Sequence, residues 1–319
     1  MRITDITVEQ MRATVCVADQ GGFTLAADRL GQSQSSLSRT VSQVEKATGA
    51  RLFDRTTRSF ALTDAGTEFL RAARVVLETY DREINNLASY LRGPSGELRL
   101  ATLPSLAATL LPPFIDRFRR TFPNVGVSLQ DLMAANIIEQ CRYGTVDLAI
   151  TAEDPELLDS LPDHFRFSPI AEEHFACILP VTHRLADRDA IDWEDLAGDS
   201  FVSFTEASSV RRITDRELAA RGIRPSQTVT AGTISAVTGL CAANLGISAV
   251  PGFVIPMTRV AGVVLRPFRG EPVTRTIGVL QDTTRTLSPA AREFLTLVAH
   301  STSADMTLPD FTTWTGLGA

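Results

Sequence analysis

The chain has 319 residues, of which 44% are apolar, so it is long enough for two domains and too apolar for a disordered protein. Its net charge is −6, and its four cysteines and four histidines show no spacing typical of a metal site or a disulfide framework. There is no apolar run of about eighteen residues and no start resembling a signal peptide, so we expect a cytoplasmic protein with no metal, no cofactor and no membrane partner.

The acidic net charge hides a basic stretch near the N-terminus. Between residues 29 and 58, six basic side chains stand against two acidic ones. A local excess of positive charge favours phosphate binding whatever the global sum is. A solvated basic face would give the same count, so the charge alone leaves both interpretations open.

Residues 1–63 are predicted to form a winged helix-turn-helix. Apolar residues from Val8 to Ala18 repeat at helical spacing, and Thr24 and Ser33 are each placed to cap a following helix. Gly31 and Gly49 suit the backbone conformation that ends a helix. Two helices separated by about three residues form a helix-turn-helix, and the polar segment 54–59 between two short strands is the predicted wing.

A long helix is predicted over 64–92, begun by Asp64 and ended by Gly93 and Pro94. Its apolar residues advance by threes and fours, as in a coiled-coil seam. They are Phe69, Ala73, Val76, Tyr80, Ile84, Leu87 and Leu91. The helix either pairs with its copy in a second subunit or packs on its own domain. Polar residues on the other faces favour the pairing.

From residue 93 to 300, strands and helices alternate, which predicts parallel sheet with crossover helices in two α/β lobes. Strands are expected at 98–102, 125–130, 147–150, 175–179, 200–204, 227–231, 247–250 and 274–280, and helices at 105–121, 134–143, 207–221, 233–244 and 288–300. Lobe I would comprise 97–170 and 268–300, lobe II would comprise 171–267, and a cleft would lie between them.

Two segments of this region have open interpretations. The helix that follows Thr102 exposes backbone N–H groups at its start, which favours an anion, although Ser105 and Thr233 could simply cap helices. Residues 301–319 form either a frayed C-terminal tail or, through Phe311 and Trp314, a segment that docks on a neighbouring surface.

Many ordered positions resemble the LysR-type transcriptional regulators. In the N-terminal part these are Ala26–Leu30, Ser33–Arg39, Val44, Glu45, Gly49, Leu52–Arg55 and Leu62–Gly66. Leu110–Pro112, Phe122, Pro123, Gly144–Ile150 and Gly246–Pro251 resemble the family's effector domain. The resemblance covers about residues 5–300. Thr14, Gln32 and Ser35 depart from the usual pattern, and Ala134 stands near a place where the family often has a hydroxyl or a glycine.

The resemblance implies an α/β protein with an all-α head. The head is the winged helix-turn-helix, 64–92 is a linker and dimerisation helix, and 93–300 is a two-lobed effector domain like a periplasmic binding protein. It also implies a DNA-binding transcriptional regulator that forms a homodimer or a tetramer and binds double-stranded promoter DNA. A small-molecule effector would lie between the lobes, and RNA polymerase is a further candidate partner.

The third helix is expected to enter the major groove. Gln34 is the first candidate for base recognition, because an amide can pair with adenine. Other candidate DNA-binding residues are Ser33, Ser35, Ser36, Ser38 and Arg39, with Arg55 and Arg58 on the wing. By the resemblance, the hydroxyls of Thr102 and Ser105 hold an effector carboxylate. From lobe II, Phe201, Ser203, Thr205 and Thr233 would face it.

Other functions remain as alternatives. An enzyme is disfavoured because no GxSxG, GxGxxG, P-loop or HExxH motif occurs, and no catalytic residue is assigned. A solute-binding transport protein would share the two lobes but would need a signal peptide, and a nucleoid-like protein would lack an effector. Cys16, Cys141, Cys177 and Cys241 are expected to be buried apolar residues, with redox sensing as the alternative.

Overall fold

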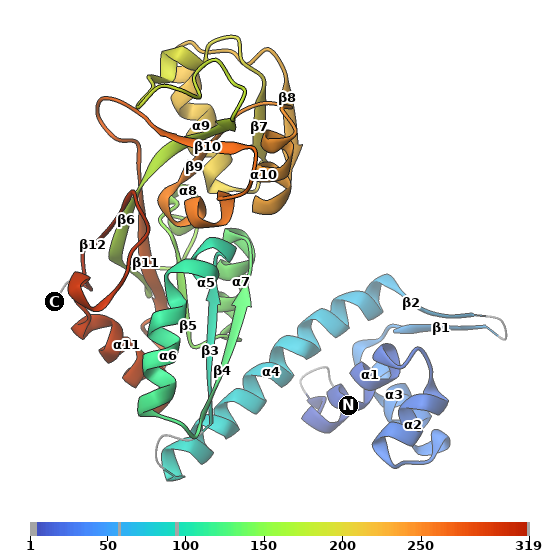
Figure 1. Cartoon of the computed structure of the whole chain (residues 1–319). Coiled ribbons are helices and arrows are strands. Elements are labelled where there is room, and N and C mark those ends of the chain that lie inside the picture. Colours follow the sequence, from blue (N-terminus) through green and yellow to red (C-terminus); the bar gives the residue numbers. More distant parts are fainter. Residues whose placement is uncertain (1–4, 57–58, 93–95, 318–319) are drawn as a thin grey trace. The chain divides into compact units, whose positions relative to one another are not determined.

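The computed structural model describes residues 5–56, 59–92 and 96–317 (Figure 1). Its contacts divide the chain into two compact units, Met1–Leu87 and Ala88–Ala319. Among the helices in this described part, none combines the length and the apolar character that crossing a bilayer requires.

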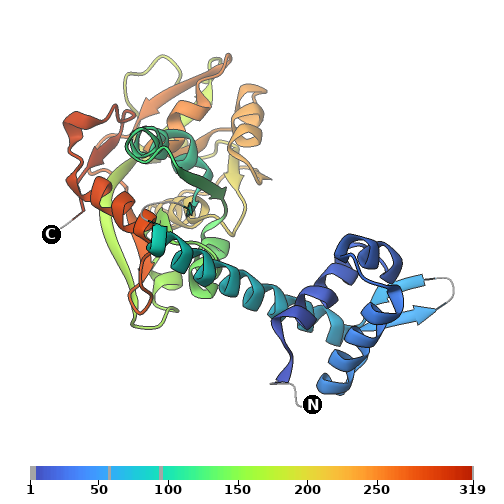
Figure 2. The same cartoon turned by 90° about the horizontal axis from the view of Figure 1, so that it is seen from below.

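The N-terminal unit contains short helices, a hairpin and the first part of a long helix. Their bounds are α1 Val8–Asp19, α2 Phe23–Leu30, α3 Gln34–Thr48, β1 Phe53–Thr56, β2 Ser59–Leu62 and α4 Asp64–Arg92. Strands β1 and β2 pair antiparallel, and the hairpin extends away from α1, α2 and α3 in both views (Figures 1 and 2). One apolar cluster joins these elements, with Val17, Leu37 and Val41 fully buried in it. The winged helix-turn-helix is therefore present, but Asp54–Thr56 and Ser59, which were predicted to lie in the tip of the wing, belong to its two strands.

The ends of α3 follow from side-chain chemistry visible in the sequence. The Ser33 hydroxyl accepts a hydrogen bond from the Ser36 N–H at 3.2 Å, so the predicted cap is confirmed. Gly31 and Gly49 have φ of 62° and 71°, and each ends a helix in the left-handed conformation that favours glycine.

The predicted cap at Thr24 is wrong. Helix α2 begins two residues earlier than a cap at Thr24 requires, at Phe23, and no side chain caps it. The Phe23 ring lies edge-on to Phe53 and Phe60, with centroids 6.0 Å away in both cases. Aromatic packing across the unit therefore places the start of this helix, and Thr24 lies inside it.

Helix α4 begins with a cap one residue before the predicted one. The Thr63 hydroxyl, rather than Asp64, accepts a hydrogen bond from the Gly66 N–H at 2.9 Å. A Cβ on Gly66 would lie 2.1 Å from the carbonyl oxygen of Leu52, so a side chain there would push the backbone apart.

The apolar residues of α4 lie on two neighbouring strips of the helix with different surroundings. Leu70, Ala73 and Leu77 form one strip, which is buried within the N-terminal unit. On the adjacent strip, Val76, Tyr80, Ile84 and Leu87 are 44%, 45%, 49% and 54% exposed. Most of the predicted seam belongs to this second strip, which has no cover within the unit. The side chain of Leu91 lies outside the described residues.

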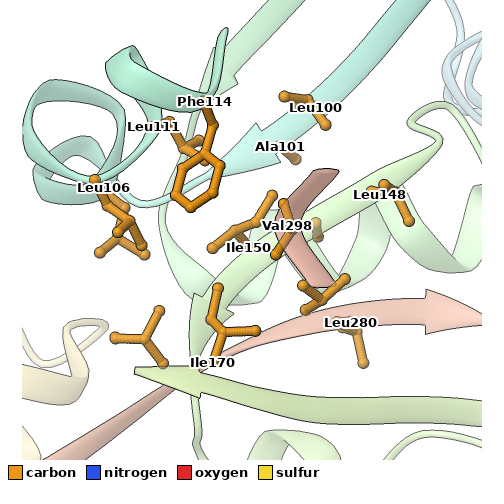
Figure 3. Packing of buried hydrophobic residues seen from close by; sticks show 14 of the residues in the cluster. Leu100, Ala101, Leu106, Leu111, Phe114, Leu148, Ile150, Ile170, Leu280 and Val298 are labelled. Atoms are coloured by element: carbon orange, nitrogen blue, oxygen red, sulfur yellow. The ribbon is translucent and has the colours of Figure 1, made fainter. Parts of the chain in front are cut away.

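Lobe I of the second unit contains a parallel core in which β3 lies between β4 and β5. Its elements are β3 Gly96–Thr102, α5 Pro104–Thr109, α6 Leu111–Thr121, β4 Val125–Asp131, α7 Ala134–Tyr143, β5 Leu148–Ala152, α8 Pro155–Leu158 and α11 Pro289–His300. Figure 3 shows part of their apolar cluster, to which the strands contribute Leu100 and Ile150 and α6 contributes Phe114. The single helix predicted over 105–121 is two helices, because Pro112 and Pro113 lack the N–H groups that would continue α5.

Lobe II has a separate apolar cluster. Its elements are β7 Phe201–Phe204, α9 Ser209–Ala220, β8 Thr228–Ala231, α10 Ile234–Ala242, β9 Ser248–Pro251, β10 Val263–Pro267 and the 3₁₀ segments Trp193–Leu196 and Gly252–Thr258. Strands β7 and β8 pair in parallel, and a glycine with φ of 152°, Gly246, precedes β9.

Two long strands connect the lobes. The strand predicted at 175–179 is the end of β6, Phe165–Pro180, which pairs with β11, Thr274–Asp282, in one part and with β9 and β10 in the other (Figure 1). All of these pairings are antiparallel, and so is that of β11 with β5. The alternating pattern predicted only parallel pairing, because the strands that return between lobes have no crossover helix to indicate their direction.

The C-terminal segment is not a frayed tail. Strand β12, Thr312–Trp314, pairs antiparallel with β6. The Trp314 ring is buried, lies 5.4 Å from the Phe114 ring, and its Nε1–H donates to the carbonyl of Ser301 at 2.9 Å. The C-terminal segment therefore docks through Trp314, and the surface on which it docks belongs to its own unit.

Candidate DNA-reading helix and ligand cavity

The N-terminal turn of α3 presents polar side chains to solvent. Gln34, Ser35, Ser36 and Arg39 are exposed, whereas Leu37 between them is fully buried in the apolar cluster. The side chains of Gln34 and Arg39 have no hydrogen-bond partner among the residues that the structure describes. A capped helix with one anchored face and one polar face can place an amide and a guanidinium against base edges and phosphates.

The other predicted DNA-binding residues differ in their exposure and in their hydrogen bonds. Ser33 is the cap of α3, and its hydroxyl lies 3.1 Å from that of Ser35. Ser38 is only half exposed. For the wing, the structure describes the backbone of Arg55 in β1 but not its side chain, and Arg58 lies outside the described residues.

The three residues that depart from the family pattern do not disrupt the packing of the N-terminal unit. Thr14 is fully buried, and its hydroxyl donates to the carbonyl of Gln10 at 2.8 Å, which satisfies the polar group inside the core. Gln32 and Ser35 are exposed, so neither removes apolar packing.

A cavity of about 300 Å³ lies between the two lobes of the second unit. Lobe I, lobe II and the connecting strands all contribute to its lining. The lining residues are Leu103, Pro104, Ser105, Asp131, Met133, Ala134, Phe204, Ala207, Ser208, Ser209, Val210, Gly232, Thr233, Ile234, Ser235, Val254, Met257 and Arg275. Its size and mostly apolar lining with a few polar groups are typical of a small-molecule site.

Several helices begin at this cavity. The residues that precede α5, α7, α9 and α10, namely Leu103, Met133, Ser208 and Thr233, all line it. Only Thr233 caps its helix, by accepting from the Ala236 N–H at 3.2 Å. The first N–H groups of α7 and α9 therefore lack a side-chain acceptor, and the positive ends of these two helix dipoles lie at the cavity wall.

Of the six predicted effector residues, the structure brings Ser105 and Thr233 to the cavity lining. Thr102, Phe201, Ser203 and Thr205 do not line it, so their placement corrects the prediction. The Thr102 hydroxyl is fully buried and donates to the carbonyl of Ile150 on the neighbouring strand at 2.8 Å. Phe201 belongs to the core of lobe II, and Ser203 is buried beside it on β7, where Phe204 is the residue that reaches the cavity.

An ion pair that the sequence did not suggest lies at one side of the cavity. Arg275 on β11 and Glu173 on β6 are neighbours in the strand register, and their closest nitrogen and oxygen atoms are 2.6 Å apart. Arg275 also donates to the Ser209 hydroxyl at 3.0 Å, and Glu173 accepts from the Phe253 N–H at 2.8 Å. Both side chains are almost fully buried, so each charge depends on the other.

A second ion pair joins the lobes. Arg212 of α9 in lobe II forms a salt bridge with Asp154, the residue that caps α8 in lobe I. The Asp154 side chain is 7% exposed and that of Arg212 is 34% exposed. The contact spans the cleft, so it depends on how far the lobes are closed.

Three of the four cysteines lack the reactive thiolate that a redox sensor needs. Burial raises the pKa of the Cys141 and Cys241 thiols to about 12, and it raises that of Cys177 well above its usual value. These groups stay protonated near neutral pH, where the reactive form would be the thiolate. Cys16 is half-buried. Within the described residues, no group of His, Cys, Asp and Glu is arranged to hold a metal ion.

Comparisons with known proteins match both units. Residues 8–67 match the family model "Bacterial regulatory helix-turn-helix protein, lysR family", and residues 91–303 match "LysR substrate binding domain". The uncharacterized HTH-type transcriptional regulator YfeR of Shigella flexneri is 30% identical to the chain over 94% of the chain and 96% of its own length.

Solved structures show the same fold. Full-length CbnR in complex with its target DNA has a TM-score of 0.73 at 22% identity, covering 92% of this chain and 98% of CbnR. The effector-binding domain of QuiR in complex with shikimate has a TM-score of 0.58 at 22% identity, covering 64% of this chain and 95% of that domain.

Proposed function

The chain belongs to the LysR family of DNA-binding transcriptional regulators, and we propose that it controls promoters through α3 in response to a small anionic molecule bound between its two lobes. In this proposal, residues 1–63 recognise DNA, 64–92 link and dimerise, and 93–300 bind the effector. The segment 301–319 completes the effector domain. The chain acts as a regulator and not as an enzyme, and it works in the cytoplasm because its DNA target is there.

The observation that carries the DNA-binding role is the exposed polar turn of α3. Gln34 supports recognition of adenine, because its amide can both donate and accept at one base edge. Arg39 supports phosphate binding, and Ser33, Ser35, Ser36 and Ser38 add shorter hydroxyl contacts. Arg55 and Arg58 would bind phosphates or the minor groove from the wing. CbnR, whose fold this chain shares, was solved on its target DNA.

We propose a homodimer, which the exposed stripe of α4 supports, or the tetramer built from two dimers that the family resemblance implies. Its exposed apolar stripe, formed by Val76, Tyr80, Ile84 and Leu87, needs a cover, and a second copy of the same helix offers a matching seam. Two reading helices held at a fixed separation can contact successive turns of the duplex. RNA polymerase is a further partner that such a complex could contact.

The helix starts at the cavity support an anionic effector. The N–H groups at the starts of α7 and α9 and the hydroxyls of Ser105 and Thr233 are all suited to a negatively charged group. QuiR binds shikimate in its corresponding domain. An effector alters the lobes only if it binds one arrangement more tightly. The salt bridge between Arg212 and Asp154 is a contact that differs between open and closed lobes.

The first prediction concerns Gln34. Gln34→Ala should relax discrimination at one base pair, at a cost of roughly 1–3 kcal/mol for the preferred sequence. Arg39→Ala should weaken binding about equally for every sequence and lower the salt dependence. Titrations by fluorescence anisotropy, with the region upstream of its own gene and with single base-pair variants of it, measure both effects.

A Gln34→Ala protein with unchanged discrimination at every base pair contradicts the role given to this side chain. Absence of salt-sensitive binding to any duplex contradicts the DNA-binding function as a whole. The same titrations with and without small carboxylates distinguish a regulator from a nucleoid-like protein, which would bind DNA identically in both cases.

A further inference from the structure

The segment 304–317, here called the C-terminal strap, lies beyond residues 91–303, which match the family model. Its strand β12 pairs with residues 171–173 of β6, whose other edge pairs there with β11 (Figure 1). Ala171 belongs to the apolar cluster of lobe I and Phe175 to that of lobe II, so β6 passes between the lobes at this point. The strap therefore adds a third strand to the crossing between the lobes.

Aromatic side chains anchor the strap in both lobes. Trp314 is 8% exposed and belongs to the apolar cluster of lobe I, against which Met306 and Leu308 also pack. Phe311 packs against the cluster of lobe II instead. Side chains in close-packed clusters resist displacement, and these two aromatic residues are close together in the chain. A change in the angle between the lobes therefore has to displace one ring or strain the chain between the two.

Backbone hydrogen bonds hold the strap to β6 on both sides of the crossing. On the side of lobe II, the His174 N–H donates to the carbonyl of Phe311 at 2.8 Å. On the side of lobe I, the N–H groups of Thr315 and Gly316 both donate to the carbonyl of Ile170, at 2.9 and 3.1 Å. Bending of β6 between Ile170 and His174 would break some of these bonds and leave their polar groups without partners.

The strap also fits closely against the 3₁₀ segment Gly252–Thr258 of lobe II. A Cβ on Gly252 would lie 2.5 Å from the carbonyl oxygen of Phe311, so this approach needs a residue without a side chain. Phe311 itself has φ of 65°, which residues other than glycine rarely adopt unless their surroundings hold them there. The contact between Phe311 and Gly252 thus fixes the strap against lobe II at one defined place.

The salt bridge of Arg212 with Asp154 shows which movement the strap opposes. Arg212 belongs to lobe II and Asp154 to lobe I, so the pair forms only when the lobes stand near the angle of this structure. The Arg212 side chain is partly exposed, and such a pair adds little stability by itself. The strap offers the larger contact between the lobes, since it combines strand pairing with aromatic packing.

We propose that the C-terminal strap holds the two lobes at one angle and thereby sets how readily the effector domain changes shape. The inference goes beyond the proposed function, because it does not depend on what the cavity binds. A ligand shifts the domain only by favouring one lobe arrangement over another, and the contacts of the strap contribute to that balance. Loss of its contact with lobe II lets the lobes adopt further angles while each lobe stays folded.

Pulsed electron paramagnetic resonance on the full-length protein tests the inference by measuring a distance between the lobes. Nitroxide labels on Glu156→Cys in lobe I and Asp189→Cys in lobe II occupy exposed positions. Cys16→Ser removes the half-buried native thiol, and the other three thiols are buried and do not react with the label. An excess of unlabelled protein ensures that the two measured labels lie in one chain. We expect a single narrow distance distribution for this parent protein.

Two variants release the strap from lobe II by different routes. Phe311→Ala removes the ring that packs against lobe II, and Gly252→Ala adds a methyl group that collides with the Phe311 carbonyl. Each should broaden the distribution and add distances that are absent from the parent. Val125→Ala is the matched control, because Val125 is 4% exposed in lobe I but lies on β4, at the end of the sheet. It should lower the stability of lobe I and leave the distribution unchanged.

Each outcome supports or overturns the inference. Unchanged distributions in the folded Phe311→Ala and Gly252→Ala proteins overturn it. Equal broadening in Val125→Ala also overturns it, because the lobe angle would then respond to any loss of stability. If circular dichroism shows that Phe311→Ala is unfolded, Gly252→Ala decides, since it keeps every side chain of the strap. An unfolded Gly252→Ala protein overturns the inference as well, because the lobes are expected to fold without this contact.

Discussion

At the scale of single residues, the buried pair of Glu173 and Arg275 is a contact whose loss on one side should destabilise the fold. Both side chains are almost fully removed from water, and each supplies the counter-charge that makes burial of the other tolerable. Losing one partner leaves an uncompensated charge, whereas losing both leaves none.

This difference gives the third prediction, a pair of variants with unequal effects. Arg275→Met alone should destabilise the effector domain by about 3–5 kcal/mol, and Glu173→Gln combined with Arg275→Met should cost clearly less. Arg259→Met is the control, because the pair of Arg259 and Asp310 is 68% and 69% exposed and should contribute little. Differential scanning calorimetry of the full chain measures the losses. A double variant less stable than the single one would contradict the explanation.

At the scale of elements, α4 has two neighbouring faces with different surroundings. One face is anchored within the N-terminal unit, where ion pairs of Arg12 with Asp81 and of Arg74 with Asp19 join α4 to α1. The other face exposes Val76, Tyr80, Ile84 and Leu87. Exposed apolar side chains at coiled-coil spacing indicate a surface for association.

The fourth prediction is that a charge on this stripe breaks the dimer. Ile84→Asp should shift the protein toward the monomer and weaken DNA binding, because a carboxylate in the seam would be buried without a partner. Glu78→Arg changes the charge at an exposed position on the opposite side of the helix and should leave the mass unchanged. Sedimentation velocity reports the oligomeric state. A dimer that persists in the folded Ile84→Asp protein would assign the interface to another surface.

At the scale of the whole molecule, the chain divides into two units with separate apolar clusters. The cluster of the N-terminal unit shares no residue with those of the two lobes, and the lobes have a cluster each while β6 and β11 connect them. Units with independent cores are expected to unfold in separate steps.

The fifth prediction follows from this division. Calorimetry of the full chain should show two thermal transitions, and a small carboxylate that binds the cavity between the lobes should raise only the midpoint temperature of the one that belongs to residues 88–319. At a hundred times its dissociation constant, a ligand that binds only the folded form adds about 2.7 kcal/mol to the stability. Trp314→Ala should lower the midpoint temperature of the same transition, since the Trp314 ring is buried against Phe114. If the ligand raises only the midpoint temperature of the N-terminal unit, the placement of the ligand in the effector domain is wrong.

Local patterns in the sequence were sufficient to predict most of the helices and strands. Ser33, Gly31 and Gly49 mark the helix ends because a cap depends on backbone groups a few residues away, and the seam of α4 follows from helical periodicity. The motif residues of the head indicated its fold and its function for the same reason, since they lie within one short stretch. The failures at Thr24 and at 105–121 arose where aromatic packing or a proline pair overrode a simple pattern.

The cavity was decided by the tertiary structure. Glu173 and Arg275 are 102 residues apart, and only the register of β6 with β11 makes them neighbours. Thr102 and Ser203 carry suitable hydroxyls, yet the packing of their strands turns them away from the lining, while Ser208 reaches it from the start of α9. Side-chain chemistry can be read along a chain, but which groups converge depends on how distant strands pair, and no local periodicity encodes that pairing.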